Sequence, residues 1–214
     1  MLVRSDDVGN LSAAGRDEMV TYGITTVIDL RSESERNGTF DARFPLPGGE
    51  RIRVTGVSYI HQALVDDAAL ERLGEASNMY ERYLLMLTTR QDAFRDIFTS
   101  IAEAEGAVLF HCFAGKDRTG LVAALLLDFA GVPPESIAAD FGETDLQLAE
   151  QYERWISLTS PDKQQELRDE LRCPPERILG VLDFVETRWG GVPSYLEASG
   201  VTPSNIDRLT ARLA

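Results

Sequence analysis

The segment of this chain whose residue types and spacing could do chemistry is HCFAGKDRTG, which runs from His111 to Gly120. Cys112 is followed six positions later by Arg118, a spacing that is not specific on its own. The context makes it specific, because the cysteine ends an apolar stretch, the arginine opens another and a glycine lies between them. We name residues 112–118 the cysteine loop. Its backbone N–H groups, backed by a helix N-terminus, can converge on a phosphoryl group.

The side chains at the two ends of the cysteine loop fit phosphoryl transfer. The positive field of a loop and a helix N-terminus favours the thiolate form of Cys112, which is the nucleophilic form. Arg118 offers a planar fork of donors to two phosphoryl oxygens and can stabilise the charge that spreads over them. We expect Phe113, Ala114 and Gly115 to line the phosphate, with the glycine allowing the backbone to curl where a side chain would obstruct.

The other residues of this segment are predicted to support the chemistry. Lys116 is one of only two lysines in the chain and would add positive charge at the rim of the phosphate site. Thr119 would donate its hydroxyl to the Cys112 sulfur and help the sulfur to leave when the intermediate hydrolyses. His111 would orient the loop through a hydrogen bond to the backbone.

A carboxylate beside a phosphate is electrostatically unfavourable, so Asp117 needs a reason. As a general acid it would protonate the leaving oxygen and then act as a general base for water. This proton matters for a tyrosyl leaving group, whose pKa is about 10. The alternative is a structural acceptor tied to Lys116, Arg118 or loop amides. Asp66 and Asp67, in a predicted loop after a short strand, are the reserve candidates for the acid.

A second polar group closes another predicted strand, where Asp29 is followed by Arg31. Parallel strands place ligands at their carboxyl ends, so Arg31 could contact phosphate or substrate and Asp29 could brace a loop. An ordinary ion pair at the strand end is the alternative. Cys173 is predicted to be inert. The dispersed cysteines and histidines predict no metal site, and the expected chemistry needs no cofactor.

Strands and helices must position these residues. The hydrophobic patterns predict strands over 25–30, 57–61 and 107–110, a polar loop over 31–56, and helices over 13–22, 78–105 with a break near residue 88, and 119–129. A strand, a glycine-bearing loop and a buried helix in this order predict an α/β fold with a mainly parallel central sheet flanked by helices. Residues 134–214 show only helical patterns. We expect one domain over 1–214, in which this helical part packs on the α/β core.

Composition bounds the function further. The formal charge of −14 over 214 residues argues against a nucleic-acid partner, because phosphate backbones require a basic face. The same charge weighs weakly against an anionic substrate, but positive groups converge locally in the cysteine loop. No apolar run approaches the roughly 18 residues of a membrane span. Two cysteines are too few for a disulfide framework and predict a reducing, cytoplasmic compartment, with leaderless secretion still open. The oligomeric state is not predicted.

The segment from His111 to Gly120 resembles the signature of cysteine-dependent protein tyrosine phosphatases, and AGKDRTG within it resembles more narrowly an atypical bacterial and fungal tyrosine phosphatase family. Residues 3–5, 26–32, 130–133 and 195–202 also resemble segments of that family. Its members usually carry an Asn-Phe-Arg-Asp-like segment before the Arg-Ser strand, whereas this chain begins just before Arg4. The resemblance implies a phosphatase fold with helices over the active site. It also implies Cys112 as nucleophile, Arg118 as phosphate ligand and Asp117 as the acid.

The sequence therefore predicts a phosphatase that hydrolyses phosphate monoesters through a cysteinyl-phosphate intermediate. Phosphotyrosine in proteins is the first expectation for its substrate. A lysine at the Lys116 position is similar to that of phosphoinositide phosphatases, so phosphoinositide or dual-specificity activity is the alternative. Rival functions are a non-catalytic phosphate-binding module and another thiol enzyme, such as an arsenate reductase or a rhodanese-like sulfurtransferase.

Overall fold

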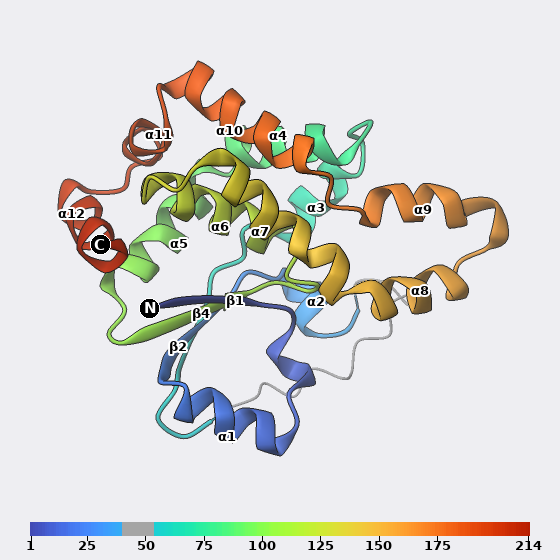
Figure 1. Ribbon diagram of the computed structural model, residues 1–214, viewed down its shortest axis with the longest axis horizontal. Helices are drawn as coiled ribbons and strands as arrows, with labels where there is room; N and C mark the ends of the chain where they lie inside the picture. Colours follow the sequence, from blue (N-terminus) through green and yellow to red (C-terminus); the bar gives the residue numbers. More distant parts are fainter. Residues whose placement is uncertain (40–53) are drawn as a thin grey trace.

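A computed structural model describes residues 1–39 and 54–214 of the chain (Figure 1). Residues 40–53 of the predicted loop over 31–56 lie outside the described residues. The described strands are β1 (Leu2–Ser5), β2 (Ile24–Asp29), β3 (Ser58–His61) and β4 (Ala107–His111). The described helices are η1 (Val8–Asn10), α1 (Ala13–Thr21), α2 (Glu33–Arg36), α3 (Asp67–Leu73), α4 (Met79–Thr89), α5 (Gln91–Glu103), α6 (Asp117–Phe129), α7 (Pro134–Gln147), α8 (Ala149–Leu158), η2 (Pro161–Lys163), α9 (Gln164–Leu171), α10 (Pro175–Trp189), α11 (Val192–Ala198) and α12 (Pro203–Leu213).

The sheet formed by these described strands is parallel throughout, in the order β1-β4-β2-β3. Its register pairs His111 at the end of β4 with Ser5 of β1 and Asp29 of β2. The carboxyl ends of three strands therefore meet at one edge, which is where a parallel sheet places its ligands. The predicted fold class, an α/β protein with a parallel sheet flanked by helices, is confirmed.

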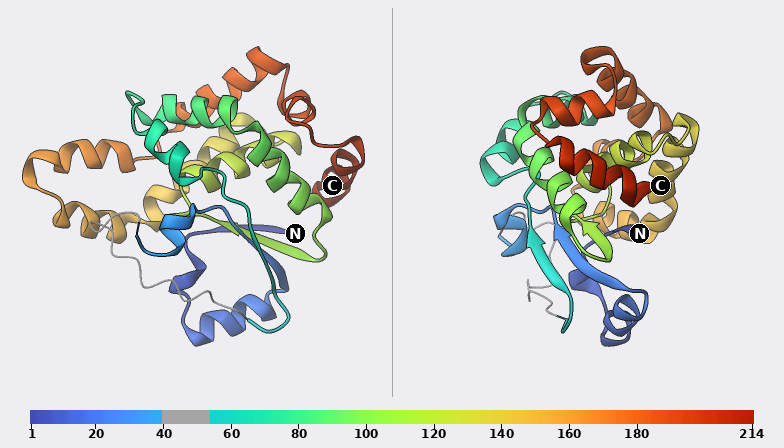
Figure 2. Two further views of the ribbon diagram at one scale, coloured as in Figure 1. Left: turned by 180° about the vertical axis from the view of Figure 1, so that it is seen from behind. Right: turned by 90° about the vertical axis from the view of Figure 1, so that its left-hand side faces the viewer.

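Helices cover the two faces of the sheet unequally. Figure 1 shows α1 below the sheet and a thick helical layer above it, and Figure 2 shows the same layering from two further sides. The α1 side holds a small apolar cluster of Val8, Met19, Ile24, Val27, Ala107 and Leu109. The other side holds the large core, in which the helix α6 is buried almost all round between the sheet and the outer helices. The large core thus fixes the start of α6, next to Cys112.

The predicted elements correspond to observed ones, with differences at their ends. The expected break in the helix over 78–105 falls at Arg90, between α4 and α5. The structure corrects two loop predictions, because the predicted loop over 31–56 contains α2, and Asp66 and Asp67, also predicted in a loop, lie at the start of α3. In α2, Ser32 and Glu35 form a reciprocal capping box, and Asp66 caps α3 through the Ala69 N–H. Capping side chains accept hydrogen bonds from the first amides of a helix, so such a helix can form even when it is too short to show apolar periodicity.

Residues 134–214, all of which the structure describes, contain helices and no strand, as predicted. Within this part, α8 and α9 pack on the cysteine loop through an aromatic and aliphatic cluster. The rings of Trp155 and Phe113 stack with their centroids 5.6 Å apart and their planes 19° apart. The helical part therefore supplies one wall of the site that the α/β part begins.

Candidate active site

The cysteine loop joins the end of β4 to the start of α6. Cys112 follows the last residue of the strand and is buried, with an exposed fraction of 2%. The helix begins at Asp117, two residues earlier than the predicted start, so the carboxylate lies in the first turn. A negative charge at that position is favourable to the helix because the unpaired amides there carry partial positive charge. The same amides form an anion-binding environment next to the thiol.

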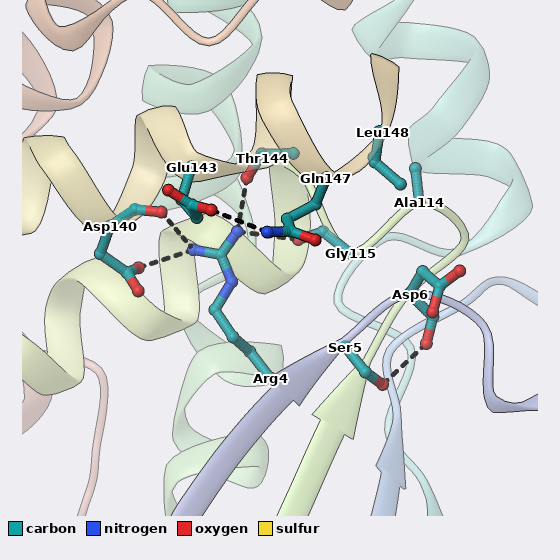
Figure 3. A pocket seen from close by; sticks show the side chains of 10 residues that line it. All are labelled: Arg4, Ser5, Asp6, Ala114, Gly115, Asp140, Glu143, Thr144, Gln147 and Leu148. Carbon is teal, nitrogen blue, oxygen red and sulfur yellow. Dashed lines mark hydrogen bonds and ion pairs between the residues drawn. The ribbon is translucent and has the colours of Figure 1, made fainter. Parts of the chain in front are cut away.

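Gly115 gives the loop its curl, as predicted. Its φ of +64° lies in the left-handed region, and a Cβ there would overlap the carbonyl of Ser5. Arg4 donates to the Gly115 carbonyl oxygen at 3.3 Å (Figure 3). In a trans peptide the C=O and N–H point in opposite directions, so the Lys116 N–H points away from Arg4. Arg4 thereby fixes the orientation of the peptide between Gly115 and Lys116, a role that the sequence does not reveal.

Arg118 is held by Glu35, a partner that its position in the sequence does not indicate. Its Nη1 and Nη2 donate to the two carboxylate oxygens of Glu35 at 2.5 and 2.6 Å, and both side chains are largely buried. Burial acts to raise the pKa of Glu35, but the charge and hydrogen bonds of Arg118 outweigh it, so the pKa lies below its usual value. The S-x-x-E pattern from Ser32 is a capping-box signal that could have found the helix, though not the ion pair.

Lys116 and Tyr83 converge on one oxygen of Asp117. The Lys116 ammonium lies 3.0 Å from Oδ1, and the Tyr83 hydroxyl donates to the same oxygen at 2.5 Å. Burial acts to raise the pKa of Asp117, but the Lys116 charge and the Tyr83 hydrogen bond lower it by more than burial raises it. The pKa of Asp117 is therefore below its usual value. Lys116 is itself buried and donates to the Glu170 carbonyl at 2.9 Å. Lys116 was expected to add positive charge at the rim of the phosphate site, and its side chain lines the cleft from beneath α9.

A cleft of about 460 Å³ opens beside the cysteine loop. Its polar floor comes from Glu35, Lys116, Asp117 and Arg118. Its walls are mostly apolar and come from α3, α4, α8, α9 and the loop, including Leu70, Leu73, Met79, Met86, Phe113, Trp155, Leu167 and Leu171. A charged floor under apolar walls can accept a ligand with an anionic end and a hydrophobic body.

The supporting residues beside Cys112 are partly as predicted. The His111 Nδ1 lies 2.9 Å from the Cys112 carbonyl oxygen, which is the expected bond between imidazole and backbone. The expected hydrogen bond from Thr119 to the Cys112 sulfur is not formed. Thr119 Oγ1 is buried and has no hydrogen-bond partner among the described residues. A buried unpaired hydroxyl is uncommon in proteins and fits a site whose ligand or thiolate it serves.

Arg31 does not lie where it could contact phosphate, which was one of its two predicted roles. Its guanidinium donates to Asp29 Oδ1 and Oδ2 at 2.9 and 2.8 Å and to Asp7 Oδ2 at 2.6 Å, and it does not line the cleft. The alternative interpretation, an ion pair at the strand end, is the one the structure supports. Asp29 braces the arginine backbone too, by accepting from the Arg31 N–H at 3.0 Å.

The two reserve candidates for the acid lie outside the cleft. Asp66 caps α3 and pairs with Arg90 at 2.7 Å, while Asp67 is the first residue of that helix and accepts from the Ser34 hydroxyl. The structure thus corrects their predicted loop, and among the described residues Asp117 is the aspartate that lines the cleft. No cluster of three or more His, Cys, Asp or Glu in residues 1–39 and 54–214 could hold a metal ion.

Comparison with known proteins agrees with this geometry. A sequence model described as the tyrosine phosphatase family matches residues 1–214. A tyrosine-protein phosphatase of Nostoc commune is 32% identical over 221 residues, which cover 99% of this chain and 73% of the relative. The triple specificity protein phosphatase PtpB of Mycobacterium tuberculosis is 26% identical over 246 residues, which cover 97% of this chain and 88% of the relative. The chain belongs to the tyrosine phosphatase family.

Family membership makes this tyrosine phosphatase homologue a hydrolase of phosphate monoesters. It also agrees with the resemblance drawn from the cysteine loop and from segments spread along the chain. None of the helices in the described part is long and apolar enough to cross a membrane.

Proposed function

We propose that this chain hydrolyses phosphotyrosine in proteins through a cysteinyl-phosphate on Cys112. The observation that carries the proposal is the arrangement of Arg118, which lies in the first turn of the helix after Cys112 and is held by Glu35 on the floor of the cleft. A guanidinium has five N–H donors, and the two bonds to Glu35 use one from each terminal nitrogen. The Nε–H and the remaining terminal donors are left for two equatorial phosphoryl oxygens. The fork is therefore oriented before the substrate arrives.

In the first step the Cys112 thiolate attacks phosphorus, the S–P bond forms and the bond from phosphorus to the phenolic oxygen breaks. Asp117 gives its proton to that oxygen. Loop amides and Arg118 stabilise the charge on the equatorial oxygens. In the second step water attacks phosphorus, Asp117 accepts its proton, and the S–P bond breaks with the Thr119 hydroxyl beside the sulfur. Phosphate leaves and the thiolate is restored.

The cleft supports an aryl ester over a small alkyl phosphate. Its apolar walls, with Phe113 stacked on Trp155, match the ring of a tyrosine above a phosphate on the polar floor. The Lys116 ammonium is already engaged by Asp117 and the Glu170 carbonyl, so it is less available to a second phosphate of a phosphoinositide. This favours phosphotyrosine over phosphoinositide as the substrate.

The proposed partner is thus a phosphorylated protein, and we place the enzyme in the cytoplasm because its two cysteines are free, as is typical of proteins in a reducing compartment. Detection of the protein in culture medium rather than in the cell extract would contradict that placement.

A substrate panel tests the proposed function. The purified protein and Cys112→Ser are assayed on a phosphotyrosine peptide, a phosphoserine peptide, phosphoinositide vesicles, arsenate and thiosulfate. We expect turnover of the phosphotyrosine peptide first, and its loss in Cys112→Ser with binding of tungstate retained. Full activity of Cys112→Ser would overturn the mechanism, phosphate binding without turnover would indicate a binding module, and preference for vesicles, arsenate or thiosulfate would indicate the other functions.

Cys173→Ser is the matched control for this panel. Burial raises the pKa of the Cys173 thiol to about 12, so it stays protonated at neutral pH and should not act as a nucleophile. We expect its activity to stay within about twofold of the parent protein.

A further inference from the structure

The hydroxyl of Tyr83 is a buried polar group in contact with the proposed acid, and the mechanism above does not use it. We propose that Tyr83 is a positioning residue that selects which oxygen of Asp117 delivers the proton. This inference rests on the proposed function, because it assigns a role within the same reaction. It was not visible in the sequence, where Tyr83 belongs to a helix 34 residues before Asp117.

Two donors occupy one oxygen of the carboxyl group and leave the other to the cleft. The Tyr83 hydroxyl and the Lys116 ammonium both bind Asp117 Oδ1, at 2.5 and 3.0 Å. Among the described residues none donates a hydrogen bond to Oδ2. The Asp117 side chain keeps 27% of its surface exposed and lines the cleft. Oδ2 is therefore the oxygen available to a leaving group.

The position of Tyr83 is rigid. Tyr83 belongs to α4, and its side chain is completely buried. Its ring packs edge-to-face against Phe141 of α7, with the ring centroids 6.4 Å apart. Burial, followed by the nearby Asp117 charge, raises the pKa of Tyr83 well above its usual value, so the hydroxyl remains a donor at any working pH. A donor fixed by packing holds its acceptor more tightly than a mobile side chain would.

This contact decides where the acidic proton lies. A proton on Oδ1 would face both the Lys116 ammonium and the Tyr83 hydroxyl hydrogen, so protonated Asp117 carries its hydrogen on Oδ2. During the first step that proton passes from Oδ2 to the phenolic oxygen while the bond from that oxygen to phosphorus breaks. The carboxylate that remains is charged, and its bonds to Tyr83 and Lys116 strengthen as the charge develops. Tyr83 thus orients the acid and stabilises its conjugate base.

The charged surroundings of Asp117 make the proton donor depend on the substrate. Lys116 and Arg118 of the loop favour its ionised form in the free protein. A phosphate dianion bound to Arg118 adds negative charge beside the carboxyl group and favours the protonated form in the complex. Binding of a substrate therefore favours protonated Asp117, the form that can act as the general acid.

Tyr83→Phe tests the role with two substrates that differ in leaving group. Phenyl phosphate needs protonation of its leaving oxygen, whereas 4-nitrophenolate leaves readily without it. We expect kcat/KM for phenyl phosphate to fall about tenfold and kcat/KM for 4-nitrophenyl phosphate to fall less than about twofold, because kcat/KM reports the first step, in which the leaving group departs. In an Asp117→Asn background, Tyr83→Phe should have no further effect, because the proton that it positions is absent.

Tyr80→Phe is the matched control on the same helix. Its hydroxyl donates to the Gly180 carbonyl at 3.2 Å, away from Asp117, so neither substrate should respond. Equal losses for the two substrates in Tyr83→Phe, or a further loss in the Asp117→Asn background, would overturn the positioning role. If Asp117→Asn itself lost activity equally on both substrates, the assignment of the acid would fail and the role of Tyr83 with it. The cysteinyl-phosphate reaction, tested by Cys112→Ser, would still stand.

Discussion

Two arginines lie on opposite sides of the cysteine loop and serve it differently. Arg118 lines the cleft and gives two of its donors to Glu35, which leaves the others for a substrate. Arg4 lies in a separate hollow of about 400 Å³ behind the loop (Figure 3). It binds Asp140 and Thr144 of α7 and the Gly115 carbonyl, at 2.7, 2.6 and 3.3 Å.

Ala114 lines both the cleft and this hollow, so the loop is a thin wall between them. On one side of the loop, Arg118 is oriented toward the cleft. On the other side, Arg4 binds α7 and the backbone of the loop. An arginine can therefore bind a substrate only where its protein partners leave enough of its N–H donors unoccupied. Substitutions on the two sides should therefore differ in kind and in size.

The largest effect is expected from Arg118→Lys. An ammonium is a point charge and cannot reproduce the two-pronged contact with phosphoryl oxygens or with Glu35. We expect kcat/KM for 4-nitrophenyl phosphate to fall about 10³-fold. Arg90→Lys is the control, since Arg90 pairs with Asp66 outside the cleft and its replacement should change kcat/KM less than about twofold. A tenfold loss or less in Arg118→Lys would show that the fork is not needed.

Glu35→Gln should have the next largest effect. The amide cannot accept both Arg118 bonds, so the guanidinium loses its orientation while its charge remains. We expect kcat/KM to fall about 10- to 100-fold and the affinity for tungstate to weaken with it. Glu33→Gln, in the same short helix but half-exposed and paired with Arg36, should leave both nearly unchanged. Equal behaviour of the two variants would refute the orienting role of Glu35.

Stability should depend on pH through the same pair. The pKa of Glu35 is lowered in the folded protein, because burial, which raises it, is outweighed by Arg118. Its stabilisation is therefore complete above the unfolded value of about 4.3 and is lost as the pH falls through the folded pKa. Urea unfolding at pH 7, 5 and 3 should show the gap between the parent and Glu35→Gln shrinking by about 1 kcal/mol or more below pH 4. A constant gap would contradict this.

The smallest effect on activity is expected behind the loop, from Arg4→Lys. The lysine can keep the ion pair with Asp140 but cannot reach Thr144 and the Gly115 carbonyl as well, so the Lys116 amide becomes less well oriented. We expect kcat/KM to fall about threefold, with little change for Arg95→Lys at the exposed pair with Asp96. A loss as large as that of Arg118→Lys would mean that Arg4 acts on the substrate directly.

The fold was predictable from the sequence wherever hydrophobic periodicity marked an element. The strand over 107–110, the buried helix after the cysteine loop and the helical part beyond residue 134 each appear close to their predicted bounds. The short helices α2 and α3 were missed because their capping residues, rather than a repeating apolar face, make them form. The hydrophobic pattern did not predict the strand β1, since four residues at a sheet edge carry too little pattern, and only the family resemblance indicated a strand at Arg4 and Ser5.

The sequence by itself determined the cysteine loop, because its nucleophile, glycine and arginine are neighbours along the chain and their spacing sets their geometry. It could not determine which distant side chains bind them. Arg31, two residues after Asp29, is bound by Asp29 and by Asp7, while Arg118 is bound by Glu35, 83 residues away, and Asp117 by Tyr83. These pairings depend on where α2 lies and on how α4 packs against α3, α5 and α10. Only tertiary packing decided them, because apolar burial places the helices and the charged groups then bind what lies within reach.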